Sequence, residues 1–572
     1  MKHMRSSRAI AMACALWVAV TGSASGTQSP APVQVADLLI VNGRVITADD
    51  QGTVAQAVAV AGPTILRVGT NEDVSALRGP GTRVIDAHGA TVAPGFNDSH
   101  VHFLSGGRSL GDVDLAGLTT LAQVQDAIRT FAAARPDTAW VRGRGWLYSP
   151  FPGGSPTRAQ LDAVIADRPA VMTCYDGHSI WVNSKALAMA GITKDTPNPK
   201  NGEVVKDPNT GEPTGHLKES ASGLIDGTMP QPTEADQRAF LRAAVAHAHA
   251  HGVTSVQDAG VDPDEMARYD EAKRAGELQV RMYVAFSASA ATTEADLDRM
   301  DAVWKRSGDD PTLKTGAVKM YADGVIESRT AAMLAPYENS RAKGATNLSS
   351  DDLNRIVAMV DKRGWQVWIH AIGDQAIRLA LDAFEHAVAA NPAPARGRRH
   401  RIEHIETIDA ADIPRFARLG VIASQQPMHV ALGDMNSTHP KGPWPDNIGP
   451  DRASRAWAWK SIRDAGGRLT FGSDWPVAPL SVGQGLWLAS TRIGPSNAAD
   501  QKLSMRDAIR AYTSFPAYAS FEEKRKGTLV PGMLADIVVL STDIVSRPPS
   551  KATDIVVDTT IFNGKVVYEK SR

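Results

Sequence analysis

The stretch VAPGFNDSHVHF, residues 92–103, decides how the rest of the chain is interpreted. It is an apolar run that ends in two histidines, His100 and His102, with one residue between them. In a β-strand the side chains at positions i and i+2 point to the same face, so both imidazoles could present a nitrogen to one cation. Taken alone, the pair is weak support for a metal site, because two ordinary surface histidines after a Pro-Gly turn explain it equally well.

Beyond this stretch, short β-branched runs alternate with helical patterns, which predicts parallel βα units and an α/β fold. Eight strands are expected, the number that closes a (β/α)₈ TIM-like barrel, and we assign the barrel to residues 94–520. The gap after the first strand is too long for one crossover and predicts a large inserted α/β subdomain within residues 104–250. The expected strands are 95–103, 253–258, 280–286, 316–322, 366–370, 401–405, 421–426 and 469–474.

Both ends of the chain are also rich in predicted strands. Residues 36–48 and 560–568 each contain an Asn-Gly pair, which favours a two-residue hairpin turn. The two ends are expected to meet in one small β-sandwich domain, built from residues 34–93 and 521–572.

Composition narrows the class of protein. The 572-residue chain is 43% hydrophobic, and 61 Lys+Arg against 62 Asp+Glu give a net charge of -1, so no basic surface for nucleic acid is expected. Residues 1–26 resemble a signal peptide, with a positive start, a short apolar core and small residues for cleavage. We therefore expect a periplasmic or secreted protein with no stable membrane anchor after cleavage. Cys174 would then be the only cysteine, which excludes an intramolecular disulfide.

Polar residues recur where the predicted strands end. Because barrel active sites lie at the carboxyl ends of the strands, these side chains should converge on one pocket. Neutral imidazole and carboxylate are ligands of Zn²⁺, which lowers the pKa of bound water toward about 7 and polarises a carbonyl group. The set of six residues is His100, His102, Lys319, His370, His404 and Asp474.

Two members of this set have chemistry beyond simple ligation. Burial beside cations would lower the pKa of Lys319, and its neutral amine could then take up CO₂ as a carbamate whose two oxygens bridge two metals. Asp474 is placed to accept the proton of the attacking water and to deliver it to the leaving amine.

The six residues, with the sequence around them, resemble the amidohydrolase superfamily, in particular the amidohydrolase-3 family that includes N-substituted formamide deformylases. The resemblance implies that the six residues bind one or two ions of zinc or another divalent metal, with Lys319 carbamylated. It covers nearly the whole chain after the signal peptide. The motifs are PGFNDSHVH at 94–102, DGHSIWVNSKAL at 176–187, VKMYADGVIESRTAAM at 318–333, HAIGDQAI at 370–377, RIEHIE at 401–406, FGSDWPV at 471–477 and GTLVPGMLADIVVL at 527–540.

Three residues outside the metal set are candidates for substrate contact. In similar proteins the histidine that matches His178 approaches the site, where it would hold the substrate carbonyl or the oxyanion; stabilising its own loop is the alternative. Ser328 and Arg329 follow the strand of Lys319 and could contact substrate, and Arg329 is equally plausible as a buried structural partner.

The resemblance implies a hydrolase that cleaves an amide-type C–N bond of an N-acyl or N-formyl amine. Metal-activated hydroxide would attack the carbonyl, with Asp474 as general base and acid and His178 as a further catalytic residue. An ester, lactone or other carbonyl hydrolase on the same metal centre is one alternative, and a non-catalytic sensor or binding protein is another. The expected partner is a small-molecule substrate, and a homo-oligomer is left open.

Overall fold

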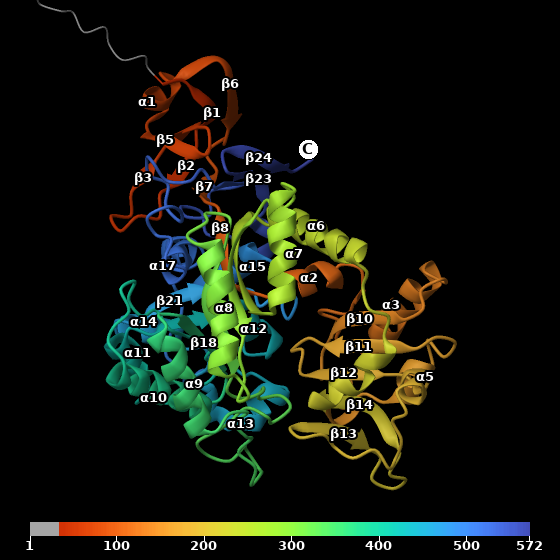
Figure 1. Ribbon diagram of the computed structural model, residues 1–572. Helices are drawn as coiled ribbons and strands as arrows, with labels where there is room; N and C mark the ends of the chain where they lie inside the picture. The colour runs from red at the N-terminus through yellow and green to blue at the C-terminus, as the bar shows by residue number, and fades with distance from the viewer. Residues whose placement is uncertain (1–33, 572) are drawn as a thin grey trace, which may run out of the picture.

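The computed structural model describes residues 34–571, so the predicted signal peptide at 1–26 lies outside the described residues. Figure 1 shows three parts: a central barrel, a β-sandwich that carries both ends of the chain, and a separate sheet to one side, formed by the insertion. Within residues 34–571, no helix is both long and apolar enough to cross a membrane.

The barrel is a sheet of eight parallel strands, which confirms the predicted fold class. In sheet order the strands are β21 (Arg468–Phe471), β20 (Ile422–Gln425), β19 (Arg401–His404), β18 (Gln366–Ala371), β17 (Leu313–Tyr321), β16 (Arg281–Ser287), β15 (Val253–Val261) and β8 (Phe96–Val101). The two ends of the sheet meet just beyond the strands. Asp474 N–H donates to His100 O at 2.7 Å, and His102 N–H donates to Trp475 O at 2.7 Å.

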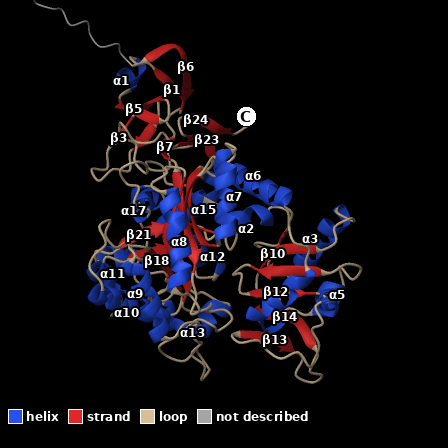
Figure 2. Ribbon diagram, viewed as in Figure 1, coloured by secondary structure: helices blue, strands red, loops and turns tan. Residues whose placement is uncertain are grey.

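Helices surround the barrel strands (Figure 2). Several begin at clear sequence signals: the Thr293 side chain accepts from Asp296 N to start α8, and Asp262 caps α7, which has a proline in its first turn. The helices are α2 (Phe103–Ser109), α6 (Glu234–Ala250), α7 (Pro263–Arg274), α8 (Glu294–Ser307), α9 (Ser350–Lys362), α10 (Asp374–Ala390), α11 (Ile413–Leu419), α12 (Pro427–Leu432), α13 (Pro443–Ala453), α14 (Trp459–Asp464), α15 (Val482–Thr491), α16 (Met505–Ala511) and α17 (Ser514–Ala519).

The insertion after β8 builds a six-stranded sheet with its own apolar core around Trp146 and Trp181. Its strands are β9 (Val113–Asp114), β10 (Val141–Trp146), β11 (Ala170–Cys174), β12 (Ser179–Val182), β13 (Gly202–Lys206) and β14 (Pro213–Glu219), with α3 (Leu121–Ala134), α4 (Arg158–Asp162) and α5 (Ser184–Met189). The helices at its two boundaries, α2 and α6, pack against each other beside the barrel. The strands of the inserted sheet lie between Val113 and Glu219, inside the range 104–250 that was expected to contain the insertion.

Both ends of the chain form the small β-sandwich, as predicted. One sheet joins β5 (Thr64–Gly69), β4 (Ala57–Ala61), β1 (Ala36–Val41) and β6 (Arg78–Asp86). The other joins β24 (Lys565–Glu569), β23 (Val557–Phe562), β22 (Ile537–Leu540), β7 (Thr91–Pro94), β2 (Arg44–Ile46) and β3 (Val54–Ala55), and α1 (Asn71–Ser75) lies beside the first sheet.

Only one of the two predicted Asn-Gly hairpins is present. Asn563 has a φ of 53° and joins β23 to its antiparallel neighbour β24. Asn42 also turns the chain, with a φ of 54°, but β1 and β2 on either side of it belong to different sheets. The hairpin predicted at 36–48 is therefore wrong. A turn sequence fixes local backbone geometry, whereas the partner of each strand is decided by tertiary packing.

Candidate metal centre

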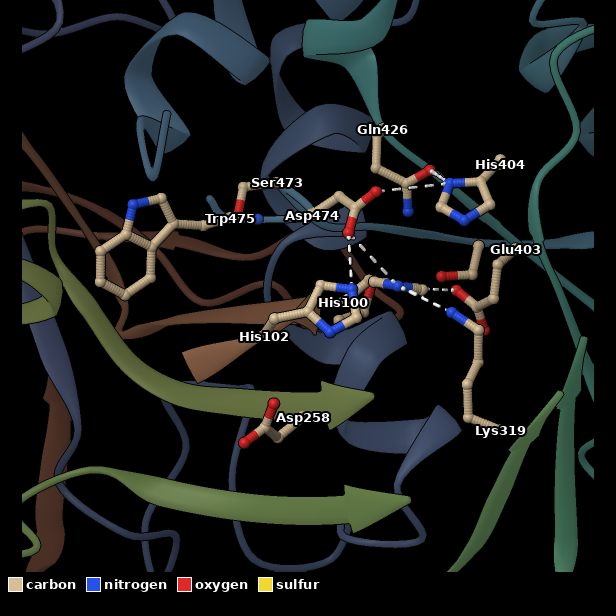
Figure 3. A network of polar contacts seen from close by, with 12 residues as sticks. His100, His102, Asp258, Lys319, Glu403, His404, Gln426, Ser473, Asp474 and Trp475 are labelled. Carbon is tan, nitrogen blue, oxygen red and sulfur yellow. Dashed lines mark hydrogen bonds and ion pairs between the residues drawn. The ribbon is translucent and has the colours of Figure 1, made fainter. Parts of the chain in front are cut away.

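Asp474 lies between histidines that come from different strands (Figure 3). Its Oδ1 is 3.2 Å from Nε2 of His102 and 3.5 Å from Nε2 of His100. Its Oδ2, on the other side, is 3.8 Å from Nδ1 of His404. Two ligands at 2.0–2.1 Å from a tetrahedral zinc ion would be about 3.3 Å apart. The spacing around Oδ1 therefore matches ligands that share one cation.

The two histidines of the opening stretch differ in their backbone. His100 is a fully buried residue of β8, whereas His102 comes one residue after that strand and starts α2. The strand is shorter than the predicted 95–103 because the His102 N–H bonds to Trp475 O, beyond β21. Even so, the two imidazoles lie close together, with ring centroids 5.7 Å apart.

Lys319, on β17, is fully buried and its Nζ lies 3.2 Å from Nε2 of His100. Burial lowers the pKa of Lys319 to about 8, against the opposing charges of Glu403 and Asp474. A substantial fraction of this amine is therefore neutral near physiological pH, which is the form that the predicted carbamate requires.

His370 and His404 end neighbouring strands, β18 and β19, and their ring centroids are 4.5 Å apart. The Nε2 of His370 donates to Gly324 O at 3.2 Å. His404 and Asp474 have positive φ values of 73° and 61°, a backbone conformation that costs free energy in residues other than glycine. Such strain is concentrated at functional sites, and here it turns both side chains toward the centre.

A buried carboxylate holds His100 in place. Glu403 accepts from Nδ1 of His100 at 2.6 Å, and the Arg401 side chain donates to the same carboxylate at 2.8 and 3.1 Å. Burial alone would raise the pKa of Glu403, but the charges of Arg401 and His100 lower it well below its usual value. Since Nδ1 carries the shared proton, the Nε2 lone pair of His100 faces Asp474 and Lys319.

His178 reaches the centre from the inserted sheet, on the loop between β11 and β12. Its ring centroid is 5.7 Å from that of His370, and its Nδ1 lies 2.8 Å from Oε2 of Glu219 on β14. Burial lowers the pKa of His178, but the hydrogen bond and charge of Glu219 outweigh it and raise the pKa to about 9. At neutral pH this imidazole is a cation and a hydrogen-bond donor.

A cavity of about 310 Å³ opens over the centre, and His102, His178, Lys319, His404 and Asp474 line it. Arg144 and Tyr321 also line this cavity. The structure places Ser328 and Arg329 elsewhere, in a neighbouring hollow of about 220 Å³. There the Arg329 Nε donates to Asn447 Oδ1 at 2.7 Å. A larger hollow of about 610 Å³ lies between β6 and β24 of the sandwich and contains none of the candidate ligands.

The sequence reasoning missed His429 and Glu403. His429 is on α12, directly after β20, so the position of the loop at a strand end could have pointed to it. Glu403 lies inside the motif RIEHIE beside a predicted ligand, but nothing in the pattern showed that it would bond to a histidine about 300 residues away.

The residues present fit a divalent cation. Asp474 Oδ1 and His429 Nε2 are buried, and neither has a hydrogen-bond partner within residues 34–571. Two groups of candidate donors meet within 4.8 Å: His100, His102 and Asp474, and His404, His429 and Asp474. Orphaned acceptor atoms of this kind, gathered at one end of a barrel, are what a metal would satisfy.

Comparisons with known proteins identify the family of the chain. The model of the amidohydrolase family matches residues 83–568. The chain is 32% identical to a putative amidohydrolase, YtcJ, of Bacillus subtilis over 92% of this chain and 99% of that one. It is 29% identical to the N-substituted formamide deformylase of Arthrobacter pascens over 94% of this chain and 99% of that one. A solved structure of an uncharacterised metal-dependent hydrolase from Pyrococcus horikoshii is 25% identical, with a TM-score of 0.69 over 89% of this chain and 98% of that one. The chain therefore belongs to the amidohydrolase family, as its motifs predicted, and is a metal-dependent hydrolase of that family.

Proposed function

We propose that this hydrolase cleaves an amide-type C–N bond other than a peptide bond, in an N-acyl or N-formyl amine. The observation that carries the proposal is the position of Asp474, a buried carboxylate set between histidines at the mouth of the barrel and beside a cavity of about 310 Å³. The similarity to a protein named N-substituted formamide deformylase supports the choice of amide substrates.

The residues that would hold the metal are His100, His102, Lys319, His370, His404 and Asp474, with zinc or another divalent ion in one or two positions. When bound, the metal would lower the pKa of water and polarise the substrate carbonyl. We propose that Lys319 carries a CO₂-derived carbamate, which its burial and lowered pKa favour.

In this proposal three side chains of the chain itself carry the reaction. Asp474 accepts the proton of the attacking water and returns it to the leaving nitrogen, which departs as a neutral amine. His178, protonated and held by Glu219, donates a hydrogen bond to the substrate carbonyl oxygen as negative charge develops there. Glu403 keeps His100 in the tautomer whose Nε2 faces the centre.

We also propose that the enzyme acts in the periplasm or outside the cell. The support is the pattern of residues 1–26, which has a positive start, an apolar core and small residues for cleavage. Mass spectrometry of the protein recovered from each cell fraction would locate it and give its first residue.

The test is a panel of N-formyl amines, N-acyl amines and N-acyl amino acids, with esters and lactones of the same acyl groups, on metal-loaded protein. We expect at least one amide to be hydrolysed faster than its matched ester, with activity lost on chelation and restored by metal. Asp474→Asn should lower kcat by about 100-fold or more, because it removes general acid–base catalysis. Asp464→Asn, at an exposed position on α14, is the matched control. Turnover of esters or lactones alone, or full activity in Asp474→Asn, would exclude the proposal.

A further inference from the structure

Arg144 brings a positive charge to the cavity of about 310 Å³ over the metal centre. It is a partly buried residue of β10, in the inserted sheet. In the part of the chain that the structure describes, its side chain bonds only to backbone carbonyls: Nε donates to Pro476 O at 2.7 Å and Nη2 to Tyr175 O at 3.2 Å. Arg142, two residues earlier on the same strand, is instead paired with Asp112 at 3.3 Å. A charge that is partly withdrawn from water needs a counter-charge, and no described carboxylate supplies one to Arg144.

The two carbonyls hold the guanidinium at a defined place in the cavity wall. Pro476 lies in the loop after β21 of the barrel, and Tyr175 lies in the loop after β11 that also carries His178. Gly177, directly before His178, lies against the same group, because a Cβ built on it would be 3.9 Å from Nη2 of Arg144. The guanidinium is therefore next to the loop whose histidine is proposed to bind the substrate carbonyl oxygen.

The two carboxylates that line the same cavity are engaged elsewhere. Asp176 accepts from the Tyr148 hydroxyl and from the His178 backbone N–H, both at 2.8 Å. Asp474 lies between the histidines of the metal centre. Neither forms an ion pair with Arg144 in the described structure. The counter-charge of Arg144 is therefore best supplied by a ligand in the cavity, and a single negative charge suits a wall that already holds two carboxylates.

We propose that Arg144 binds a carboxylate of the substrate, so that the enzyme prefers amides with a free carboxylate close to the scissile bond. A guanidinium presents parallel N–H donors that match the two oxygens of a carboxylate, and these charge-assisted bonds are stronger than bonds to neutral groups. The carboxylate can belong to the amine, as in an N-acyl amino acid, or to the acyl group, as in a half-amide of a dicarboxylic acid. The inference rests on the proposed function and narrows its substrate class. Arg144 sets specificity and moves no proton.

The experiment compares substrates that are matched except for the carboxylate. N-formyl and N-acetyl derivatives of neutral amino acids are supplied as free acids and as carboxamides, and N-alkyl succinamic acids are paired with N-alkyl butanamides. We expect the kcat/KM of the metal-loaded wild type to favour the acid by about 10- to 100-fold in at least one series, as charged hydrogen bonds provide. A preference confined to the amino acid series places the carboxylate on the amine, and one confined to the succinamic series places it on the acyl group.

The variants test whether Arg144 is the cause of this preference. Arg144→Met should abolish it, mainly by raising KM for the acid, and should leave the neutral substrate nearly unchanged. Arg144→Lys keeps the charge without the planar fork and should retain part of it. Arg129→Met, at an exposed position on α3, is the control and should retain all of it. Each preference is a ratio measured within one preparation, so incomplete folding of a variant cancels.

Two results would overturn the inference while the amide hydrolase stands. One is a wild type that cleaves acids and their neutral counterparts equally well, and the other is an Arg144→Met variant that keeps the preference. If no amide is cleaved at all, the proposed function fails. Calorimetric titration with the same pairs then decides the inference, because tighter binding of the acid by the wild type alone supports it and equal binding by wild type and Arg144→Met contradicts it.

Discussion

At the scale of single residues, the centre depends on charged side chains buried in the protein interior. Arg401 and Glu403 are both fully buried, and Arg401 also donates to Ser99 O at 2.6 Å and lies over the Trp368 ring at 3.9 Å. A buried ion pair of this kind adds little stability compared with apolar residues, but the removal of one partner leaves an uncompensated charge. The Arg401–Glu403 pair therefore holds the His100 ring in position, and loss of either charge should destabilise the fold.

We predict that Glu403→Gln lowers the free energy of unfolding by about 3–5 kcal/mol, because the Arg401 charge is left unpaired in the barrel interior. The contribution of Glu403 is present above its unfolded pKa and is lost as pH falls through its lowered folded pKa, so the deficit should be evident at neutral pH. Calorimetry of the metal-free protein at one scan rate measures it. Glu385→Gln breaks exposed ion pairs with Arg415 and Arg418 and should cost under about 1 kcal/mol. Equal shifts in the two variants would contradict the explanation.

At the scale of elements, the inserted sheet brings the His178 side chain to a centre made by the barrel. The loop between β11 and β12 carries His178, and β14 carries Glu219, whose N–H also donates to His178 O at 2.7 Å. Thr330, from the barrel, donates to Oε1 of Glu219 at 2.7 Å and so ties the insertion to the loop after β17. The protonation of His178 therefore depends on how the two parts are packed.

We predict that Glu219→Gln moves the alkaline limb of the pH–kcat/KM profile from near pH 9 toward the ordinary histidine pKa of about 6.5. Because the pKa of His178 is raised to about 9 in the folded protein, its cation is present at neutral pH and is lost as pH rises through about 9. Glu203→Gln, which removes the partner of Lys218 on the adjacent strand, should leave the profile in place. An unchanged alkaline limb in Glu219→Gln would show that His178 does not act as the cationic donor.

At the scale of the whole molecule, one buried ion pair fastens the sandwich to the barrel. Arg281, at the start of β16, donates to both oxygens of Asp536, one residue before β22, at 2.5 and 2.9 Å. Both side chains are almost fully buried. Because β16 is a barrel strand and β22 is in the sandwich, the pair fixes how the two parts dock.

We predict that Asp536→Asn lowers stability by about 3–5 kcal/mol and loosens this docking, since Arg281 loses its counter-charge in a buried place. Limited proteolysis should then release the segment after residue 536 faster than in the wild type, and calorimetry should show a lower unfolding temperature. Asp50→Asn is the matched control, because the Asp50–Arg510 pair also joins sandwich to barrel but Asp50 is 97% exposed. If both variants are cleaved at the wild-type rate, the pair does not secure the interface.

The barrel and the main members of the centre could be predicted from sequence because their signals are local. Each barrel strand contains at least one β-branched residue, and each of His370, His404 and Asp474 lies near or just beyond the end of a strand. Features that depend on distant partners could not be predicted this way. The Asn42 turn leads into a different sheet, and the Ser328 and Arg329 side chains line a separate hollow. The role of Glu403 depends on its hydrogen bond to His100, which comes from a distant strand.

The pairing of β7 with β22 has a consequence for biosynthesis. β7 ends at Pro94, immediately before the first barrel strand, yet its partner β22 begins at Ile537. At translation rates of about 5–20 residues per second, the ribosome needs roughly twenty seconds to a minute and a half to make the polypeptide between them. During that interval one edge of β7 remains uncovered in the nascent chain, where unpaired edges invite aggregation. The sheet that anchors the catalytic barrel is thus among the last structures to be completed, after elongation is nearly finished.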